Sequence, residues 1–136
     1  MDMMSEMMRS MPMMEDGMGM KMDMAMLQEC VEACSACSMA ATMCADSDTG
    51  DDEARCASMC MNTADVAMTM MRMMLRPGGY DPAVMSAMMT ATITMGEACA
   101  AECRMHADMD DHCRTCAMAC DAMVDACRRA MTMMAA

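Results

Sequence analysis

The segment CVEACSAC, residues 30–37, places three thiols within eight residues. Cys30, Cys34 and Cys37 are spaced by four and then three, which puts their side chains on one face of an α-helix. A cysteine can be a packing residue, a redox catalyst, half of a disulfide or a metal ligand. The segment therefore predicts a helix with a row of thiols along one side, and the rest of the chain must indicate what the row is for.

The same spacing recurs in three later segments, so we expect an all-α chain with four long helices. Asp51 or Asp52 is expected to cap the second helix, and Asp81, followed by Pro82, the third. Helices of about 22 residues are about 33 Å long. Because short connections make neighbouring helices antiparallel, the sequence predicts an antiparallel four-helix bundle over residues 22–136. The expected helices cover approximately residues 23–45, 52–75, 82–106 and 110–134.

A methionine-rich segment, residues 1–21, precedes the predicted bundle. Met3, Met4, Met7 and Met8 lie at helical offsets, and Pro12 and two glycines interrupt the pattern that follows. We therefore expect a flexible or partly helical N-terminal arm.

The composition excludes several classes of function. The net charge of −12 argues against nucleic-acid binding, which needs Lys and Arg for the phosphates. No apolar run approaches the roughly 18–20 residues of a membrane span, so no membrane insertion is expected. The sequence leaves the compartment open between the cytoplasm and export with a signal already removed. With 33 Met, 12 Cys and no Phe or Trp in 136 residues, the predicted core is built of sulfur-containing side chains.

The inward face of each predicted helix carries sulfur at alternating offsets of three and four, the spacing of bundle-core positions. His106 and His112 flank the turn between the last two helices and are candidate ligands at one end of the bundle. The candidate metal ligands on the helices are Cys30, Cys34, Cys37, Cys44, Cys56, Cys60, Met70, Met85, Met88, Met95, Cys99, Cys103, Cys113, Cys116, Cys120, Met123 and Cys127.

Several uses of these thiols can be compared. Buried cysteine is a common packing residue, but twelve on one set of faces is too many for packing alone. Thiols four apart on a helix do not have the geometry of a disulfide, and the spacing offers no single pairing between helices. The CxxC segments at Cys34–Cys37 and Cys113–Cys116 lack the βαβ context of redox enzymes. Metal binding remains the best interpretation.

The ligand chemistry indicates which metal. Zinc prefers closed sets of four ligands, whereas the predicted ligands form long rows. Thiolates together with thioethers select Cu(I). We therefore expect multiple Cu(I) ions along the core, on the order of one per thiol.

The segment CAAECRMHADMDDHCRTCAMACDAMVDAC, residues 99–127, together with CASMCMNTADV and CVEACSAC, resembles the bacterial copper storage proteins, a family of four-helix bundles that bind Cu(I). The resemblance covers about residues 26–134. It implies a homotetramer of antiparallel bundles with inward Cys ligands, and with Met and His ligands near one end. The chain departs from the family pattern where relatives often have Cys, which implies a lower capacity and easier release; these positions are Ala41, Thr63, Ala67, Met70, Met85, Met88, Thr92, Met95 and Met123.

Storage of Cu(I), with no enzymatic activity, is thus the leading hypothesis. The alternatives are a copper chaperone or delivery protein that uses the methionine-rich arm to exchange metal with a partner, and a zinc-binding or purely structural bundle.

Overall fold

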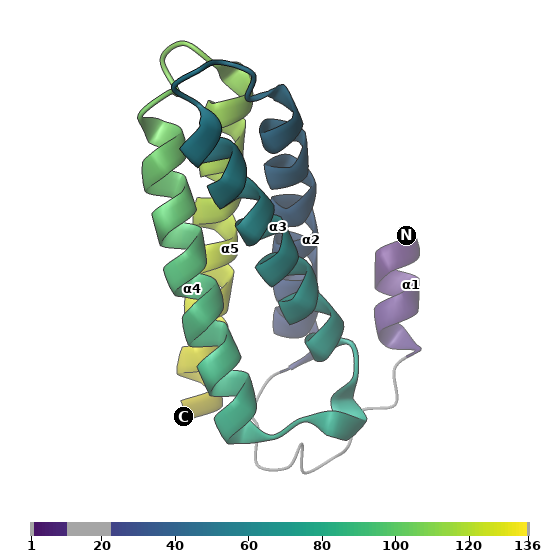
Figure 1. Ribbon diagram of the computed structural model, residues 1–136. Coiled ribbons are helices and arrows are strands. Elements are labelled where there is room, and N and C mark those ends of the chain that lie inside the picture. The colour runs from purple at the N-terminus through teal and green to yellow at the C-terminus, as the bar shows by residue number, and fades with distance from the viewer. Residues whose placement is uncertain (1, 11–22, 136) are drawn as a thin grey trace.

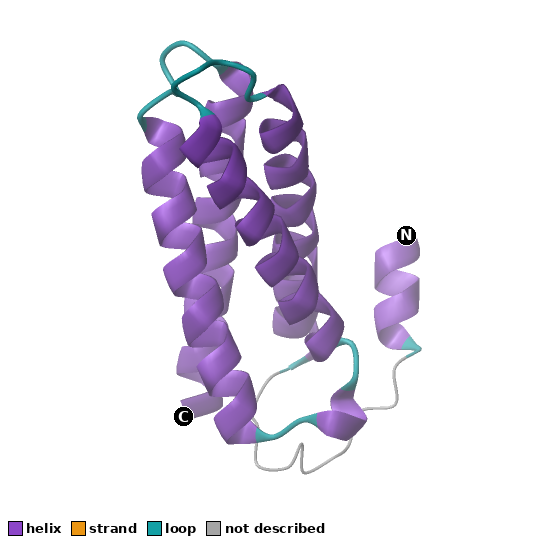
Figure 2. Ribbon diagram, in the orientation of Figure 1, coloured by secondary structure: helices purple, strands orange, loops and turns teal. Residues whose placement is uncertain are grey.

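The computed structural model describes residues 2–10 and 23–135, and no strand occurs in this part of the chain. A short helix near the N-terminus precedes four long helices, as Figures 1 and 2 show. The all-α prediction is confirmed. The elements are α1 (Met3–Arg9), α2 (Met24–Ser47), α3 (Ala54–Met74), the 3-10 turn η2 (Pro77–Gly79), α4 (Pro82–Arg104) and α5 (Asp111–Ala135).

The four long helices form a ring in which α2 contacts α3 and α5, and α4 also contacts α3 and α5 (Figure 1). Successive helices run in opposite directions, as short connections require. The segments 48–53 and 105–110 lie together at one end of the bundle, which we call the loop end (Figure 1). Residues 75–81 lie at the opposite end, called the far end. None of the described helices is long and apolar enough to cross a membrane.

The starts of α2 and α4 follow capping chemistry. The Asp23 carboxylate accepts a hydrogen bond from the Met26 amide (2.7 Å), and Asp81 accepts one from the Val84 amide (3.1 Å), as predicted for Asp81. The prediction that Asp51 or Asp52 caps the second long helix was wrong. Glu53 occupies the N-cap of α3 without a side-chain cap bond. Its carboxylate instead accepts a hydrogen bond from the Gly50 amide (3.1 Å).

The core is a column of sulfur-containing side chains surrounded by the ring of helices. Two predicted core positions on α4 were wrong, because Met88 and Met95 are only half-buried. Met89 and Gly96 take their places in the buried face. Counted from Cys99 towards the N-terminus, the buried positions of α4 are spaced by three and then four residues. The predicted core positions are spaced by four and then three residues.

The far end of the core is closed by larger apolar side chains. Leu27, Met74, Tyr80 and Met85 are all buried there. The Tyr80 hydroxyl donates a hydrogen bond to the Met74 carbonyl, which satisfies its polar atom inside the core.

Helix α1 packs against α2. Met8 is fully buried and Met4 is partly buried, whereas Met3 and Met7 are exposed. The Gln28 amide donates a hydrogen bond to the Ser5 hydroxyl at 2.7 Å. The flexible or partly helical arm over residues 1–21 stays a prediction, because residues 1 and 11–21 of it lie outside the described residues.

Gly96 allows α4 and α5 to approach closely. A Cβ atom at this position would lie 2.7 Å from the Val124 Cγ2 atom and 3.1 Å from the Met123 Cε atom. The stiff valine cannot move aside without shifting α5. The absence of a side chain at 96 therefore fixes the distance between two helices that both line the core.

We expect Gly96→Ala to lower the free energy of unfolding of the metal-free protein by about 1 kcal/mol. Overpacking costs about 1–3 kcal/mol, and the higher helix propensity of alanine offsets up to about 1 kcal/mol of this cost. Chemical denaturation under reducing conditions measures the change. Gly78→Ala is the matched control, since nothing lies within 4 Å of the position that its methyl group would occupy, and it should have little effect. An increase in stability for Gly96→Ala would contradict the close approach.

Candidate metal centre

All twelve cysteines are free, and their side chains have 0% exposure. The helical rows predicted from the sequence therefore face the core, and a disulfide scaffold is excluded for this structure. Every thiol is held by a long helix, which fixes its direction without the help of loops. The result is a buried set of soft ligands from four separate helices.

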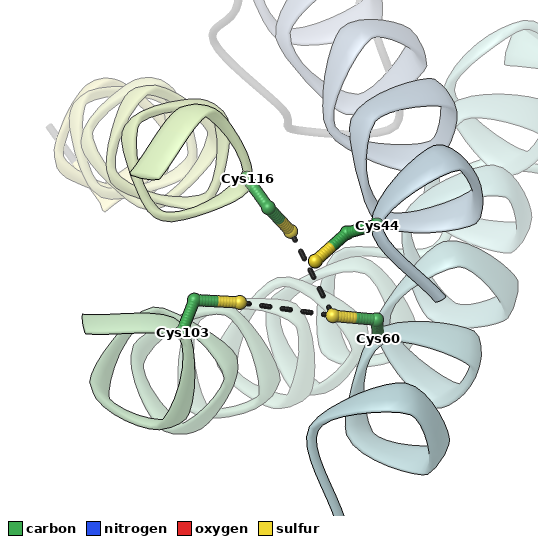
Figure 3. Close-up of side chains that lie close together, drawn as sticks. All are labelled: Cys44, Cys60, Cys103 and Cys116. Atoms are coloured by element: carbon green, nitrogen blue, oxygen red, sulfur yellow. Dashed lines mark hydrogen bonds between the residues drawn. The ribbon is translucent and has the colours of Figure 1, made fainter. Parts of the chain in front are cut away.

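One thiol from each long helix meets near the loop end. The Sγ atoms of Cys44, Cys60, Cys103 and Cys116 all lie within 4.8 Å of one another. Figure 3 shows the four side chains pointing towards a common centre. The Cys60 Sγ atom lies 3.7 Å from that of Cys103 and 3.9 Å from that of Cys116. We call these four residues the thiol quartet.

The quartet continues into a larger group through further short sulfur contacts. The Cys60 Sγ atom lies 3.8 Å from that of Cys99, and the Cys37 and Cys120 Sγ atoms are 3.7 Å apart. Four thiols alone would suit a tetrahedral zinc site, but a continuous group of thiols suits bridged Cu(I) ions. The nine-thiol group consists of Cys37, Cys44, Cys56, Cys60, Cys99, Cys103, Cys113, Cys116 and Cys120.

The remaining thiols, Cys30, Cys34 and Cys127, lie on α2 and α5 towards the far end. They form the three-thiol group. Thioethers from α3 and α4 line the facing side of this part of the core, where the predicted ligands Met70 and Met85 are buried with the unpredicted Met89. The predicted ligand Met123, on α5, is also buried. Residues 88 and 89 are adjacent methionines, so the sequence carries no signal that selects one of them.

The two histidines at the loop end have different surroundings. The His112 Nδ1 atom lies 3.4 Å from the Cys44 Sγ atom and 3.5 Å from that of Cys113. The His106 ring instead lies 3.4 Å from the Glu102 carboxylate, and it makes no hydrogen bond with a thiol among the described residues. Met105 and Met109, which flank His106, are 75% and 86% exposed. Only His112 is therefore brought to the thiols.

Asp48 is a site residue that was not predicted from the sequence. Its side chain has 0% exposure and lies 3.5 Å from the His112 ring. It also receives a contact from the Cys113 thiol at 3.6 Å. The available signal was its offset of four residues from Cys44, which places it one turn beyond that thiol, at the C-cap of α2.

Burial controls the ionisation of the outer thiols in the column. Desolvation raises the pKa of Cys30 to about 12 and that of Cys44 to about 11. Hydrogen bonds to Cys103, Cys116 and Cys99 raise the pKa of Cys60, whereas hydrogen bonds from its neighbours lower the pKa of Cys99. Most of the thiols are therefore protonated near neutral pH, and a bound metal must displace their protons.

We expect the metal-free protein to lose stability as the pH rises above about 9. Unfolded cysteine ionises near pH 8.5, whereas the folded thiols whose pKa is raised, such as Cys30 and Cys44, keep their protons to higher pH. The folded state then binds more protons than the unfolded state, so stability falls between about pH 9 and 12. Thermal unfolding at stepped pH under reducing conditions measures this. The metal-loaded form serves as the control, because its thiols are already deprotonated, and an unchanged melting temperature of the metal-free form up to about pH 11 would contradict the raised pKa values.

Comparisons with known proteins give a family match and several similar solved structures. The family model described as copper storage protein matches residues 20–132. A structure of the Streptomyces lividans copper storage protein Ccsp loaded with 10 copper equivalents has a TM-score of 0.86 and 32% identity, covering 96% of this chain and 98% of that chain. No curated protein sequence gave a significant match.

Two further structures of the Streptomyces lividans protein are similar. One, described as a cytosolic copper storage protein with five coppers, has a TM-score of 0.77 and 35% identity, and covers 79% of this chain and 93% of that chain. A variant with one histidine changed to alanine has a TM-score of 0.80 and 34% identity, covering 84% and 98%. With its family match over most of its length and its core of buried thiols, the chain belongs to the copper storage protein family.

Proposed function

We propose that this protein stores Cu(I) on the sulfur atoms of its core. The observation that carries the proposal is the nine-thiol group, in which buried Sγ atoms from four helices approach to between 3.7 and 4.0 Å. Soft thiolates select Cu(I), and loss of the thiol protons on binding offsets the charge of the buried ions. Two structures of one relative, the Streptomyces lividans protein, are described as loaded with 10 copper equivalents and with five coppers.

The proposed ligands differ in strength. All twelve cysteines supply thiolates, and His112 supplies a nitrogen ligand beside Cys44 and Cys113. Met70, Met85 and Met123 add neutral thioethers in the far half of the core, where copper should be held less tightly. Met88 and Met95, which are half-buried, and His106, which pairs with Glu102, are weaker candidates than the sequence suggested.

Anaerobic titration of the fully reduced protein with Cu(I) tests the proposal. We expect saturation at about twelve ions per chain, on the order of one per thiol. The free Cu(I) concentration is buffered with a competing chelator, and total copper is measured after desalting. Saturation at one or two ions would contradict storage.

A delivery function is the runner-up. Met3 and Met7 of α1 are exposed, so their thioethers are accessible to a partner protein. This alternative requires the arm for metal exchange. Deletion of residues 1–21 should then abolish uptake from a copper donor, whereas a storage core should still fill. A zinc-binding or purely structural bundle has no comparable support in the continuous thiol group.

Three further properties complete the proposal. We infer a cytosolic location, because twelve free thiols suit a reducing compartment and one relative is described as cytosolic. The family is one of storage proteins, which supports binding without catalysis. The family resemblance implies a homotetramer, and the exposed Met39, Met43 and Met61 on α2 and α3 offer apolar surface for association. Light scattering measures the assembly.

A further inference from the structure

Methionines surround the far end of the bundle, outside the copper sites proposed above. Helix α2 begins at this end, whereas α3 and α5 end there (Figure 1). Close to that end, each of these three helices carries two half-buried methionines that pack against the core. Towards the loop end, Met59 is the only half-buried methionine among the described residues that does so. The methionine collar consists of Met24, Met26, Met71, Met73, Met131 and Met134.

Buried thioethers link the collar to the thiols of the far half. Met70 and Met74 on α3, and Met85 and Met89 on α4, are at most 1% exposed. Sulfur ligands therefore extend from the three-thiol group, through these four side chains, to the collar at the rim. A thioether is a soft ligand for Cu(I) but carries no negative charge, so it holds the ion less tightly than a thiolate does. Methionine is also unbranched and flexible, which suits a ligand that passes an ion to its neighbour.

Tyr80, the single aromatic residue of the chain, covers the far end of the core. It is 4% exposed, and its hydroxyl donates a hydrogen bond to the Met74 carbonyl at the end of α3. Burial raises the pKa of Tyr80 to about 12, and the charge of the Cys30 thiolate adds to the shift, so the hydroxyl keeps the proton that it donates. Cys30 is the first thiol of α2 counted from the far end. The ring therefore separates the three-thiol group from the collar side of the bundle.

The connection that carries Tyr80 has room to move. Gly78 and Gly79 are exposed, and nothing lies within 4 Å of the position that a Cβ atom would occupy at either residue. The Gly79 amide donates to the Arg76 carbonyl (3.0 Å) and the Tyr80 amide donates to the Pro77 carbonyl (3.1 Å), so both bonds lie within the connection itself. Outward rotation of this segment can keep these two bonds. Its cost is the loss of the Tyr80 hydroxyl bond and of the burial of the ring.

We propose that the far end is a port for the release of Cu(I), with the methionine collar as its transient ligands and Tyr80 as its lid. The proposal rests on the proposed function, because it requires copper in the core. Copper held by the three-thiol group would otherwise have to leave past the nine-thiol group, whose sites are occupied in the loaded protein. The collar offers this copper a route over neutral ligands that do not trap it.

Anaerobic release of Cu(I) from the loaded, full-length protein to excess bathocuproine disulfonate tests the lid. Tyr80→Ala should show a fast phase of about three ions, on the order of one per thiol of the three-thiol group. This phase should be at least about tenfold faster than release from the wild type, which requires the barrier to fall by only about 1.4 kcal/mol. Tyr80→Phe keeps the ring and loses only the hydrogen bond, so its release should accelerate less.

Two controls separate an open lid from a generally loosened bundle. Val124→Ala removes buried apolar volume away from the far end and should leave the release rate unchanged. Adding Cys30→Ala and Cys34→Ala to Tyr80→Ala should remove most of the fast phase, because its copper comes from the three-thiol group.

A collar variant tests the thioethers while Tyr80 stays in place. Leucine keeps the apolar volume of methionine and removes its sulfur, so the variant should fold and release the copper of the three-thiol group severalfold more slowly. The collar variant changes Met71, Met73, Met131 and Met134 to leucine. Its matched control changes four exposed methionines elsewhere to leucine and should release copper at the wild-type rate; these are Met39, Met43, Met61 and Met118.

The port is overturned if the collar variant releases copper at the wild-type rate while its Cu(I) capacity is normal. It is also overturned if the fast phase of Tyr80→Ala persists without Cys30 and Cys34, since the whole bundle would then be loosened. Saturation of the wild type at one or two ions would instead contradict storage itself. Measuring capacity before each release experiment keeps the two failures apart.

Discussion

Replacing Cys60 and Cys103 together by alanine is expected to reduce the Cu(I) capacity by about four ions, twice the number of thiols removed. Cys60 is the centre of the nine-thiol group, since its Sγ atom lies within 4.0 Å of those of Cys56, Cys99, Cys103 and Cys116. In a connected group each thiolate bridges two Cu(I) ions, so its loss affects both. Copper per chain at saturation measures the change.

The matched control removes the same number of thiols from the three-thiol group. Cys30→Ala with Cys34→Ala leaves every contact of the nine-thiol group intact, and we expect it to lose no more than about two ions. Circular dichroism of both variants checks that the helices are retained. Equal losses of capacity in the two variants would show that the thiols act as independent sites and would contradict a bridged cluster.

Cu(I) loading is expected to raise the melting temperature by at least about 20 °C. A ligand that binds only the folded state at 1,000 times its dissociation constant stabilises by about 4 kcal/mol. For a chain of this length about 1 kcal/mol corresponds to roughly 3–5 °C, so two such ions already account for the rise. The ligands come from four helices and are brought together only by folding, which couples binding to stability.

Anaerobic thermal unfolding followed by circular dichroism measures this effect at several copper-to-protein ratios. The melting temperature should rise steeply during the first additions, as the nine-thiol group fills. The Cys60→Ala, Cys103→Ala variant should show a smaller rise. Identical melting temperatures for the metal-free and saturated wild-type protein would mean that copper binds outside the folded core.

The positions of the thiols could be predicted from the sequence because cysteine marks them without ambiguity. The spacing predicts that the thiol rows face inward, and all twelve cysteines are buried. The helix boundaries followed from turn residues and from Asp81 with Pro82, where capping chemistry is local. Local chemistry and hydrophobic periodicity thus determine most of this simple bundle.

The register of α4 could not be predicted in the same way. Both 88 and 89 are methionine, and position 96 is a glycine whose burial depends on the approach of Val124. The sequence carries no side-chain contrast that selects one offset. The correct register follows only from how α4 packs against α5, which is a tertiary property.

The loop end was the least predictable part of the site. His106 and His112 look alike in the sequence, but only His112 reaches the thiols, because His106 turns to Glu102. Asp48 and Glu53 belong to a polar connecting segment of the sequence, yet their carboxylates lie at the mouth of the core. Side chains from the connection between α2 and α3 meet side chains from the first turn of α5 there, and spacing along the sequence does not indicate such long-range contacts.

The central claim is that the interior of the bundle binds monovalent copper. A crystal structure of the anaerobically Cu(I)-loaded protein, with anomalous scattering measured on both sides of the copper absorption edge, tests it most directly. We predict several copper peaks inside the ring of helices, with the strongest beside the Sγ atoms of Cys60, Cys103 and Cys116. Copper peaks confined to surface methionines, with the core thiols free of metal, would contradict it.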